Sequence, residues 1–194
     1  MARNETELAR RIGQGDRRAY EEFVDAFGAR VHSLVRHYIA DATDAEDVTQ
    51  EIFIDLFRCA GTFRGESSLS TWVYRVAFNH CMKHLKRGLP ASESLEESHE
   101  VADASPDPQQ WAARRELSNQ VQQAVGTLSP LHRDVVILHE MHGLTYGECA
   151  LVLGIPIGTV KSRLSNAFRT LRASLGGYVL GETDAHPGAL GEAA

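Results

Sequence analysis

The chain has 194 residues, of which 43% are hydrophobic and 24% charged, a composition typical of a globular protein with one or two domains. No apolar run reaches the ~18 residues of a membrane span, and the charged N-terminus lacks a signal peptide's apolar stretch, so we expect no membrane insertion and a cytoplasmic protein. The formal net charge of −6 argues against simple nucleic-acid binding, yet residues 41–55 lack Lys and Arg while 154–173 lack acids. Blocks of opposite sign predict several partners.

The apolar residues of the first half recur at helical spacing. Val31, Leu34, Val35, Tyr38 and Ile39 fall on one helix face, and residues 48–57 form a second apolar stripe. A third helix is predicted over residues 70–86, capped by Ser70 or Thr71. The first half therefore reads as a helical domain over residues 1–87.

Residues 88–110 change the character of the chain. They are rich in Ser, Pro, Glu and Asp and poor in apolar residues, which predicts a flexible acidic linker. Helical spacing returns over residues 117–128, and another helix is expected from Pro130 to Gly143. We thus predict an all-α fold with a second domain over residues 111–176 and a disordered tail over 177–194.

The second domain contains a helix-turn-helix pattern. Thr145 and Glu148 form a capping box at the start of one helix, Gly154 supplies a tight turn, and Pro156 opens the next helix. That helix has an apolar back, on which we expect Phe168 to pack, and a polar front made by Ser162, Ser165, Asn166 and Arg169. The pattern indicates duplex DNA binding, although an ordinary helical hairpin with solvated charges has the same spacing.

Cysteine and histidine patterns indicate no cofactor. Cys59, Cys81 and Cys149 are far apart and odd in number, so we expect reduced, mostly buried thiols. His80 and His84 have a spacing that can hold a metal. Because no second pair lies near them, we predict no metal site.

Two stretches resemble a known family. "DAEDVTQEIFIDLF" followed by "TFRGESSLSTWVYRVAFNHCMKHLKR" resembles the N-terminal domain of extracytoplasmic-function (ECF) sigma factors. "LSPLHRDVVILHEMHGLTYGECALVLG" followed by "GIPIGTVKSRLSNAFRTLR" resembles their promoter-binding C-terminal domain. The resemblance covers most of residues 15–175 and implies a non-enzymatic, all-α subunit that binds core RNA polymerase and directs it to promoters.

The resemblance also implies residue roles. Core polymerase would bind Asp47, Gln50, Glu51 and Asp55, which otherwise read as a solvated helix face. The opened −10 element would be recognised by Arg64, Glu66, Ser67, Ser68, Trp72, Arg75, Asn79 and Lys83, although Trp72 also suits core packing. The −35 element would be read by Thr159, Lys161, Ser162, Arg163, Ser165, Asn166 and Arg169. Many family members carry arginine at the position of Asn166.

Partners follow from the same resemblance. We expect core RNA polymerase, promoter DNA and an anti-sigma factor that occludes the polymerase-binding surfaces. The alternative is a stand-alone helix-turn-helix regulator whose first half is a sensor, but a sensor needs neither an acidic docking helix nor a basic loop and helix. No nucleophile elbow, phosphate-binding loop or paired metal-ligand motif supports an enzyme.

Overall fold

The structure is a computed structural model that describes residues 2–87 and 120–179. These residues form helices joined by turns, with no β-strand among them. The first half contains α1 (Ala2–Gly13), α2 (Arg17–Arg36), α3 (Ala42–Cys59), the 3-10 turn η1 (Ala60–Thr62) and α4 (Leu69–Arg87). The second half contains a helical segment over 120–126, α6 (Pro130–Val136), the π-helical turn η2 (Ile137–Met141), α7 (Tyr146–Leu153) and α8 (Ile157–Val179). The all-α prediction is confirmed.

The helices of the first half begin at polar caps and bury the predicted stripes. Asp16 accepts hydrogen bonds from the backbone N–H groups of Arg18 and Ala19 at the start of α2. Asp41 accepts one from Asp44 at the start of α3, so each cap satisfies donors that have no partner within the helix. The five residues of the 31–39 stripe are buried, as are Val48, Ile52 and Leu56.

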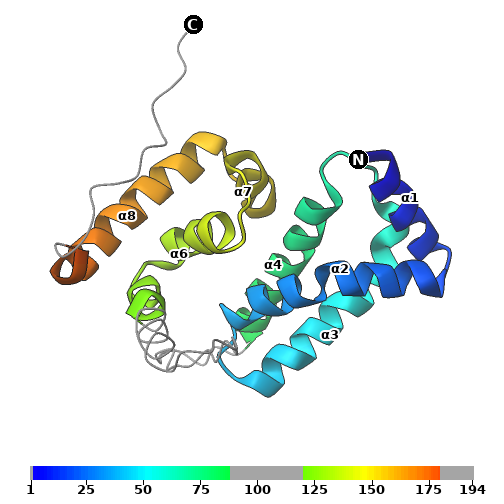
Figure 1. Cartoon of the computed structure of the whole chain (residues 1–194), viewed down its shortest axis with the longest axis horizontal. Coiled ribbons are helices and arrows are strands. Elements are labelled where there is room, and N and C mark those ends of the chain that lie inside the picture. The colour runs from blue at the N-terminus through cyan, green and yellow to red at the C-terminus, as the bar shows by residue number, and fades with distance from the viewer. Residues whose placement is uncertain (1, 88–119, 180–194) are drawn as a thin grey trace, which may run out of the picture.

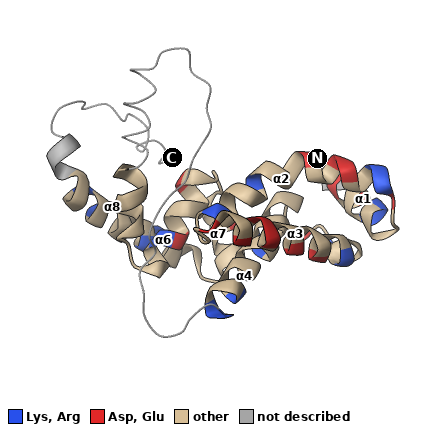
Figure 2. Ribbon diagram, turned by 90° about the horizontal axis from the view of Figure 1, so that it is seen from below, with Lys and Arg blue, Asp and Glu red and all other residues tan. Residues whose placement is uncertain are grey.

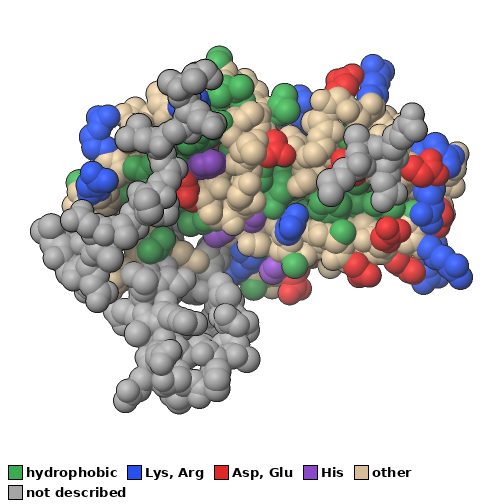
Figure 3. Space-filling view, turned by 45° about the horizontal axis from the view of Figure 1, so that its top comes forward, with side chains coloured by type: hydrophobic (Ala, Val, Ile, Leu, Met, Phe, Trp, Pro, Cys, Tyr) green, Lys and Arg blue, Asp and Glu red, His purple; other side chains and the backbone are tan. Residues whose placement is uncertain are grey.

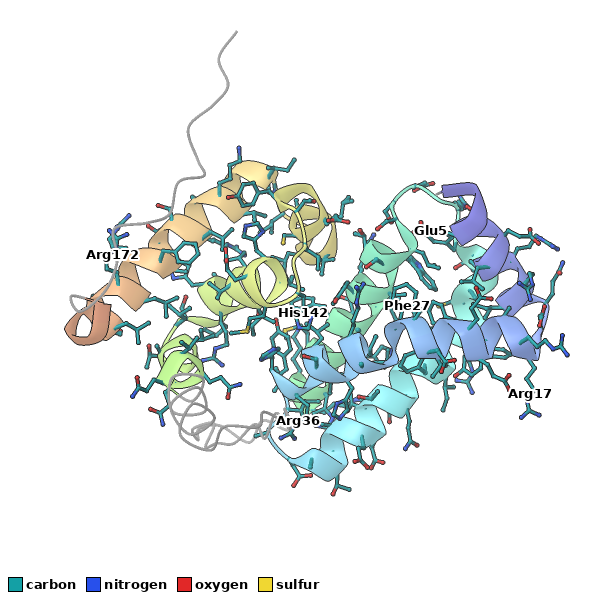
Figure 4. The ribbon with its side chains drawn as sticks, in the orientation of Figure 1. Glu5, Arg17, Phe27, Arg36, His142 and Arg172 are labelled. Carbon is teal, nitrogen blue, oxygen red and sulfur yellow. The ribbon has the colours of Figure 1, made fainter. Side chains whose placement is uncertain are left out.

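The start of α4 differs from the prediction. Ser70 and Thr71 lie inside the helix, and the cap is Ser68, whose Oγ accepts the Thr71 backbone N–H at 3.0 Å. A second cap comes from α1, where the Glu5 carboxylate accepts the Leu69 backbone N–H at 3.0 Å (Figure 4). Spacing alone could not identify Glu5, because its contact with Leu69 exists only once α1 has folded over α4.

The helix-turn-helix of the second half forms as predicted. Thr145 and Glu148 make both bonds of the capping box, and Gly154 ends α7 in the left-handed region with φ of 65°. Val160, Leu164 and Ala167 are buried, but the prediction for Phe168 was wrong, because 46% of it is exposed. The apolar back of α8 is therefore narrower than the sequence indicated.

The two halves pack against each other. In Figure 1 the first half lies on the right, the second half on the left, and α7 stands beside α4. Buried side chains of both halves belong to one continuous apolar cluster. The predicted linker (88–110) lies outside the described residues, as does the predicted tail beyond Val179, the last residue of α8. No described helix is long and apolar enough to cross a bilayer.

Candidate nucleic-acid and partner interfaces

The first candidate interface is a row of polar side chains along α3. We call Asp47, Gln50, Glu51 and Asp55 the α3 stripe. Asp47, Gln50 and Glu51 are exposed, and within residues 2–87 and 120–179 their side chains make no hydrogen bond or ion pair. In Figure 2 the ribbon of α3 carries several red segments, which mark its Asp and Glu residues. Since these carboxylates are unpaired, they are available to a basic partner surface.

Asp55 stands apart from the rest of the α3 stripe. His80 of α4 lies 3.0 Å away, from Nε2 to Asp55 Oδ2, and Arg58 lies 3.5 Å from Oδ1. The carboxylate thus joins α3 to α4 as well as facing solvent. This contact also gives His80 a structural role, and no group of three or more potential metal ligands occurs in the described part of the chain.

The second candidate interface is the loop before α4 together with an outer row on that helix. Gly65 has φ of 72°, in the left-handed region that glycine adopts without strain. Arg64 and Glu66 are exposed beside it. Further along α4, Arg75, Asn79 and Lys83 are exposed and follow one another at helical spacing. Loop and row together present two arginines, a lysine and an amide to solvent.

Three predicted members of this interface are less accessible. Trp72 is half-buried and packs against Phe63 with ring centroids 5.6 Å apart, which matches the core-packing alternative for this residue. Ser68 is also half-buried, because its Oγ caps α4 and lies 3.5 Å from Glu148 Oε1 in the other half of the chain. Ser67 is half-buried beside it.

The third candidate interface is the polar face of α8. We call Ser162, Ser165, Asn166 and Arg169 the reading face, and all four are exposed. The buried side chains of Val160, Leu164 and Ala167 hold the opposite side of α8 on the domain. Arg169 Nη2 donates to Asn166 Oδ1 at 2.9 Å, so these two side chains form one unit. A helix with this orientation can enter a major groove.

The other predicted members of this third interface have different surroundings. Lys161 is exposed, and its Nζ lies 5.6 Å from the Tyr146 ring centroid. Thr159 and Arg163 are half-buried, and the Arg163 charge acts on Asp134 of α6. Figure 3 shows Lys and Arg at the left end, over α8, and mixed charges at the right end, over α1 and α2.

Sequence reasoning missed a cluster of polar contacts between the halves. We call it the domain interface, and its members are Tyr38, Ser68, Thr71, Tyr74, Asp134, His142 and Glu148. The Thr71 hydroxyl donates to Glu148 Oε1 at 2.9 Å, while Glu148 Oε2 accepts the Thr145 backbone N–H at 2.9 Å. The sequence predicts Glu148 only as a helix cap, and nothing in its spacing indicates that it also contacts the other half of the chain.

Tyr38 and Asp134 form the buried part of the domain interface. The Tyr38 hydroxyl donates to Asp134 Oδ1 at 3.1 Å, and the residues are 5% and 9% exposed. Burial raises the pKa of Asp134 to about 6, although the Tyr38 hydrogen bond and the charges of Arg133 and Arg163 act in the opposite direction. A buried carboxyl that titrates near neutrality is costly to keep charged, so this contact depends on its hydrogen bond.

His142 lies at the middle of the contact between the halves (Figure 4). Its Nδ1 is 3.2 Å from the Tyr74 hydroxyl, and its ring meets that of His37 edge-on with centroids 5.5 Å apart. Burial lowers the pKa of His142 to about 4, helped by the charge of Arg30, so the imidazole is neutral at pH 7. Its buried Nε2 has no hydrogen-bond partner among the described residues.

An open cleft of about 450 Å³ lies at the domain interface. Arg30 and Ser33 of α2 line one side, and His142 and Glu148 line the other. Beside this cleft, buried apolar side chains of both halves pack into one continuous cluster.

Burial also determines the acidity of the cysteine thiols. Cys81 and Cys149 are buried, and burial raises the pKa of each to about 12. Thiols with so high a pKa are poor nucleophiles and poor metal ligands at pH 7. Cys59, on α3, is half-buried.

Known proteins match both halves of the chain. The family model for sigma-70 region 2 matches residues 23–88, and that for sigma-70 region 4 matches residues 118–171. The RNA polymerase sigma-H factor of Pseudomonas aeruginosa is 33% identical over 179 residues, which cover 87% of this chain and 92% of the relative. The ECF RNA polymerase sigma-E factor of Escherichia coli K12 is 33% identical over 170 residues, covering 82% of this chain and 88% of the relative.

Solved structures show the same architecture. CnrH, in complex with the cytosolic domain of CnrY, has a TM-score of 0.68 at 25% identity and covers 90% of this chain and 98% of its own. RpoE of Bartonella quintana, in complex with the anti-sigma factor NepR, has a TM-score of 0.64 at 20% identity and covers 81% of this chain and 96% of its own. The region 2 match removes the basis for a stand-alone regulator. The chain belongs to the ECF sigma factors of the sigma-70 family, the non-enzymatic subunits that bind core RNA polymerase and direct transcription initiation at promoters.

Proposed function

We propose that the three candidate interfaces divide the work of this sigma factor. The α3 stripe binds core polymerase, the loop before α4 and the outer row of α4 bind the opened −10 element, and the reading face of α8 binds the −35 element. The observation that carries this assignment is the orientation of α8, whose apolar side is buried and whose reading face is exposed. That orientation leaves a polar helix face free for the major groove.

The charges of each surface suit its partner. The exposed carboxylates of Asp47 and Glu51 favour a basic protein surface, and they act more on association rate and register than on affinity. Arg64, Arg75 and Lys83 are exposed cations that can follow the phosphates of a separated strand. The exposed amide and guanidinium of Asn166 and Arg169 can bond to base edges.

The assignment has a direct test. Core polymerase from the native cell would be combined with the full chain and a library of genomic promoter fragments, and the transcripts would be sequenced. We expect initiation only in the presence of the chain, at sites sharing −35 and −10 sequences. Substitution of Asn166 and of Arg64 should alter the −35 and the −10 preference respectively. If each substitution changes the preference at the other element, the assignment is overturned.

The partners and location follow from the same role. CnrH was solved with the cytosolic domain of CnrY, and the Bartonella RpoE with the anti-sigma factor NepR. By analogy we include an anti-sigma factor among the partners of this chain. A protein that works on core polymerase and promoter DNA acts in the cytoplasm.

A further inference from the structure

Helix α1 has no role in the assignment above. The match to sigma-70 region 2 begins at residue 23, whereas α1 ends at Gly13. This helix nevertheless lies against η1 and the start of α4, the two elements that flank the loop before α4, residues 63–68. Figure 4 shows Glu5 between α1 and the start of α4. The helix is therefore placed to hold this loop from its inner side.

Buried apolar residues fix α1 in this position. Ala9 and Ile12 are 1% and 2% exposed. They belong to the same apolar cluster as Phe63, at the start of the loop, and Leu69, directly after it. Glu5 precedes Ala9 by four residues, so it lies on the same face of α1, one turn beyond the buried pair. A carboxylate thus continues a buried stripe, at the point where α1 meets a backbone donor instead of an apolar side chain.

That donor is the first backbone N–H of α4. The Leu69 N–H donates to Glu5 Oε2 at 3.0 Å. The cap residue Ser68 does not satisfy it, because a cap side chain accepts from the second or third N–H of a helix, and Ser68 Oγ accepts from Thr71. A carboxylate at a helix N-terminus is also favoured by the helix dipole. Glu5 therefore fixes the residue at which the loop ends and α4 begins.

The same helix also approaches the middle and the beginning of the loop. A Cβ on Gly65 would lie 3.0 Å from Thr6 Oγ1, so the side-chain position of Gly65 faces α1. Its neighbours Arg64 and Glu66 are exposed. Before the loop, the end of α1 lies against η1 so closely that Gly13 has no room for a Cβ. One face of the loop is thus backed by α1, and the other carries side chains that the proposed function assigns to the −10 element.

We propose that α1 positions the loop before α4 for the −10 element, and that Glu5 is the positioning residue through which it sets the conformation of the loop. This inference rests on the proposed function, since it takes the loop to bind the opened strand. A loop that is held at both ends binds a separated strand with a smaller loss of conformational freedom. Glu5 itself does not contact DNA. It acts through the Leu69 N–H, and so through the directions in which Arg64 and Glu66 point.

Two substitutions of Glu5 separate its hydrogen bond from its charge. Glu5→Ala removes the acceptor of the Leu69 N–H, while Glu5→Gln keeps a side-chain oxygen that can accept the same bond without the charge. The matched control is Glu7→Ala, which removes the same charge from α1 but breaks only an exposed ion pair with Arg10, a kind of contact that contributes little to stability. Circular dichroism and co-elution with core polymerase check that each variant folds and docks.

The first measurement is the base preference of the holoenzyme at the −10 element. Core polymerase with each full chain would transcribe a library in which the −35 element is fixed and the −10 element is randomised. We expect Glu5→Ala to reduce the discrimination between −10 bases by roughly three- to tenfold, as the loss of one hydrogen bond allows, while Glu5→Gln and Glu7→Ala keep the wild-type preference. A loss of stability alone would lower all transcripts in proportion and leave the ratio between bases unchanged. An unchanged preference in Glu5→Ala, or an equal loss in Glu5→Gln or Glu7→Ala, would overturn the proposal.

The second measurement follows the hydrogen bond itself in the free protein. Hydrogen exchange of the Leu69 amide would be recorded by NMR for each full-length chain. We expect exchange to be severalfold faster in Glu5→Ala than in the wild-type, Glu5→Gln and Glu7→Ala chains, because the donor loses its acceptor and the first turn of α4 opens more often. Equal exchange in all four chains would show that Glu5 does not hold the start of α4, and the proposal would fail.

The variant Arg64→Ala distinguishes failure of this inference from failure of the proposed function. It removes an exposed side chain of the loop and leaves the Glu5 contact in place. If Arg64→Ala leaves the −10 preference unchanged, the loop does not read that element, and the proposed function and this inference fail together. If Arg64→Ala changes the preference and Glu5→Ala does not, only the positioning role of α1 is lost.

Discussion

Asn166 is the residue at which the reading face differs from many relatives. Its Oδ1 accepts from Arg169 at 2.9 Å, so a two-point contact with adenine requires Arg169 to release that oxygen. Asparagine pairs best with N6 and N7 of adenine, whereas arginine pairs with O6 and N7 of guanine. We predict that Asn166→Arg shifts one −35 position from adenine toward guanine, with a discrimination of roughly 1–3 kcal/mol, measured by transcription of a randomised −35 library.

A charge-matched variant separates base reading from general attraction. Ser174→Arg adds the same charge two turns further along α8 and should strengthen binding without altering base preference. The idea fails if Asn166→Arg leaves the preference unchanged at every position. It also fails if Ser174→Arg produces the same shift.

Asp134 and His142 should give stability opposite dependences on pH. The pKa of Asp134 is raised to about 6 from an ordinary 3.8, so its stabilising effect is full below pH 3.8 and is lost as pH rises through about 6. The pKa of His142 is lowered to about 4 from 6.5, so its effect is full above pH 6.5 and is lost as pH falls through about 4. The groups that face Asp134 are Tyr38, Arg133 and Arg163. Those that face His142 are Tyr74, His37, Arg30 and Glu148.

Single variants should separate these two effects. When the pH falls from about 7 to about 5, the Asp134→Asn variant should lose more stability than the wild type. Over the same change, the His142→Gln variant should gain stability relative to the wild type. Each difference is at most about 1.4 kcal/mol per pH unit for each proton. Urea unfolding midpoints at the two pH values measure both. Parallel pH profiles for all three chains would contradict the assignment of these groups.

Single residues were predictable where their role is local. The Thr145 and Glu148 cap and the left-handed Gly154 were readable because the partners lie within a few positions of each other. Tyr38 and Asp134 are 96 positions apart, and apolar spacing assigns Tyr38 only to a buried face. Its hydroxyl partner depends on how two domains meet, which no local pattern encodes.

At the scale of elements, the helices and their order could be predicted from the periodicity of apolar residues. The close approach of one element to another could not. α1 packs on η1 so closely that a Cβ on Gly13 would lie 2.7 Å from the Cα of Gly61. We predict that Gly13→Ala lowers the free energy of unfolding by about 1–3 kcal/mol, as overpacking does. Urea unfolding followed by circular dichroism measures the loss.

Gly28→Ala is the matched control within α2. The nearest atom to its Cβ would be Val24 Cγ1 at 3.9 Å, an ordinary contact. Alanine is the better helix former, so this change should stabilise the protein by up to about 1 kcal/mol. Equal effects of the two substitutions on the free energy of unfolding would show that the close approach of α1 to η1 does not exclude a side chain at position 13.

At the scale of the whole molecule, both domains were predicted and their contact was not. Each domain leaves a local signature in apolar spacing and caps. The polar part of the contact is built from hydroxyl groups and from acids that read as solvated or capping residues, such as Asp134 and Glu148. The candidate surfaces on α3 and α8 could be predicted because exposed polar rows have helical spacing, whereas the cover on Ser68 required the fold.

Docking on polymerase should depend on the α3 stripe as a surface of the whole molecule. Asp47 and Glu51 are exposed, and their side chains have no bonded partner in the described part of the chain. Surface substitutions of this kind change stability by no more than about 0.5 kcal/mol. We predict that Asp47→Arg with Glu51→Arg abolishes core polymerase binding while the helical circular-dichroism signal persists. The control is Glu21→Arg with Asp25→Arg, exposed acids at the same spacing on α2, which makes the same change in charge and should bind core normally. Co-elution with core polymerase measures the binding of both variants. The docking assignment is lost if the α3 variant still binds core polymerase. It is also lost if the α2 control fails equally, because net charge and not the α3 stripe would then govern association.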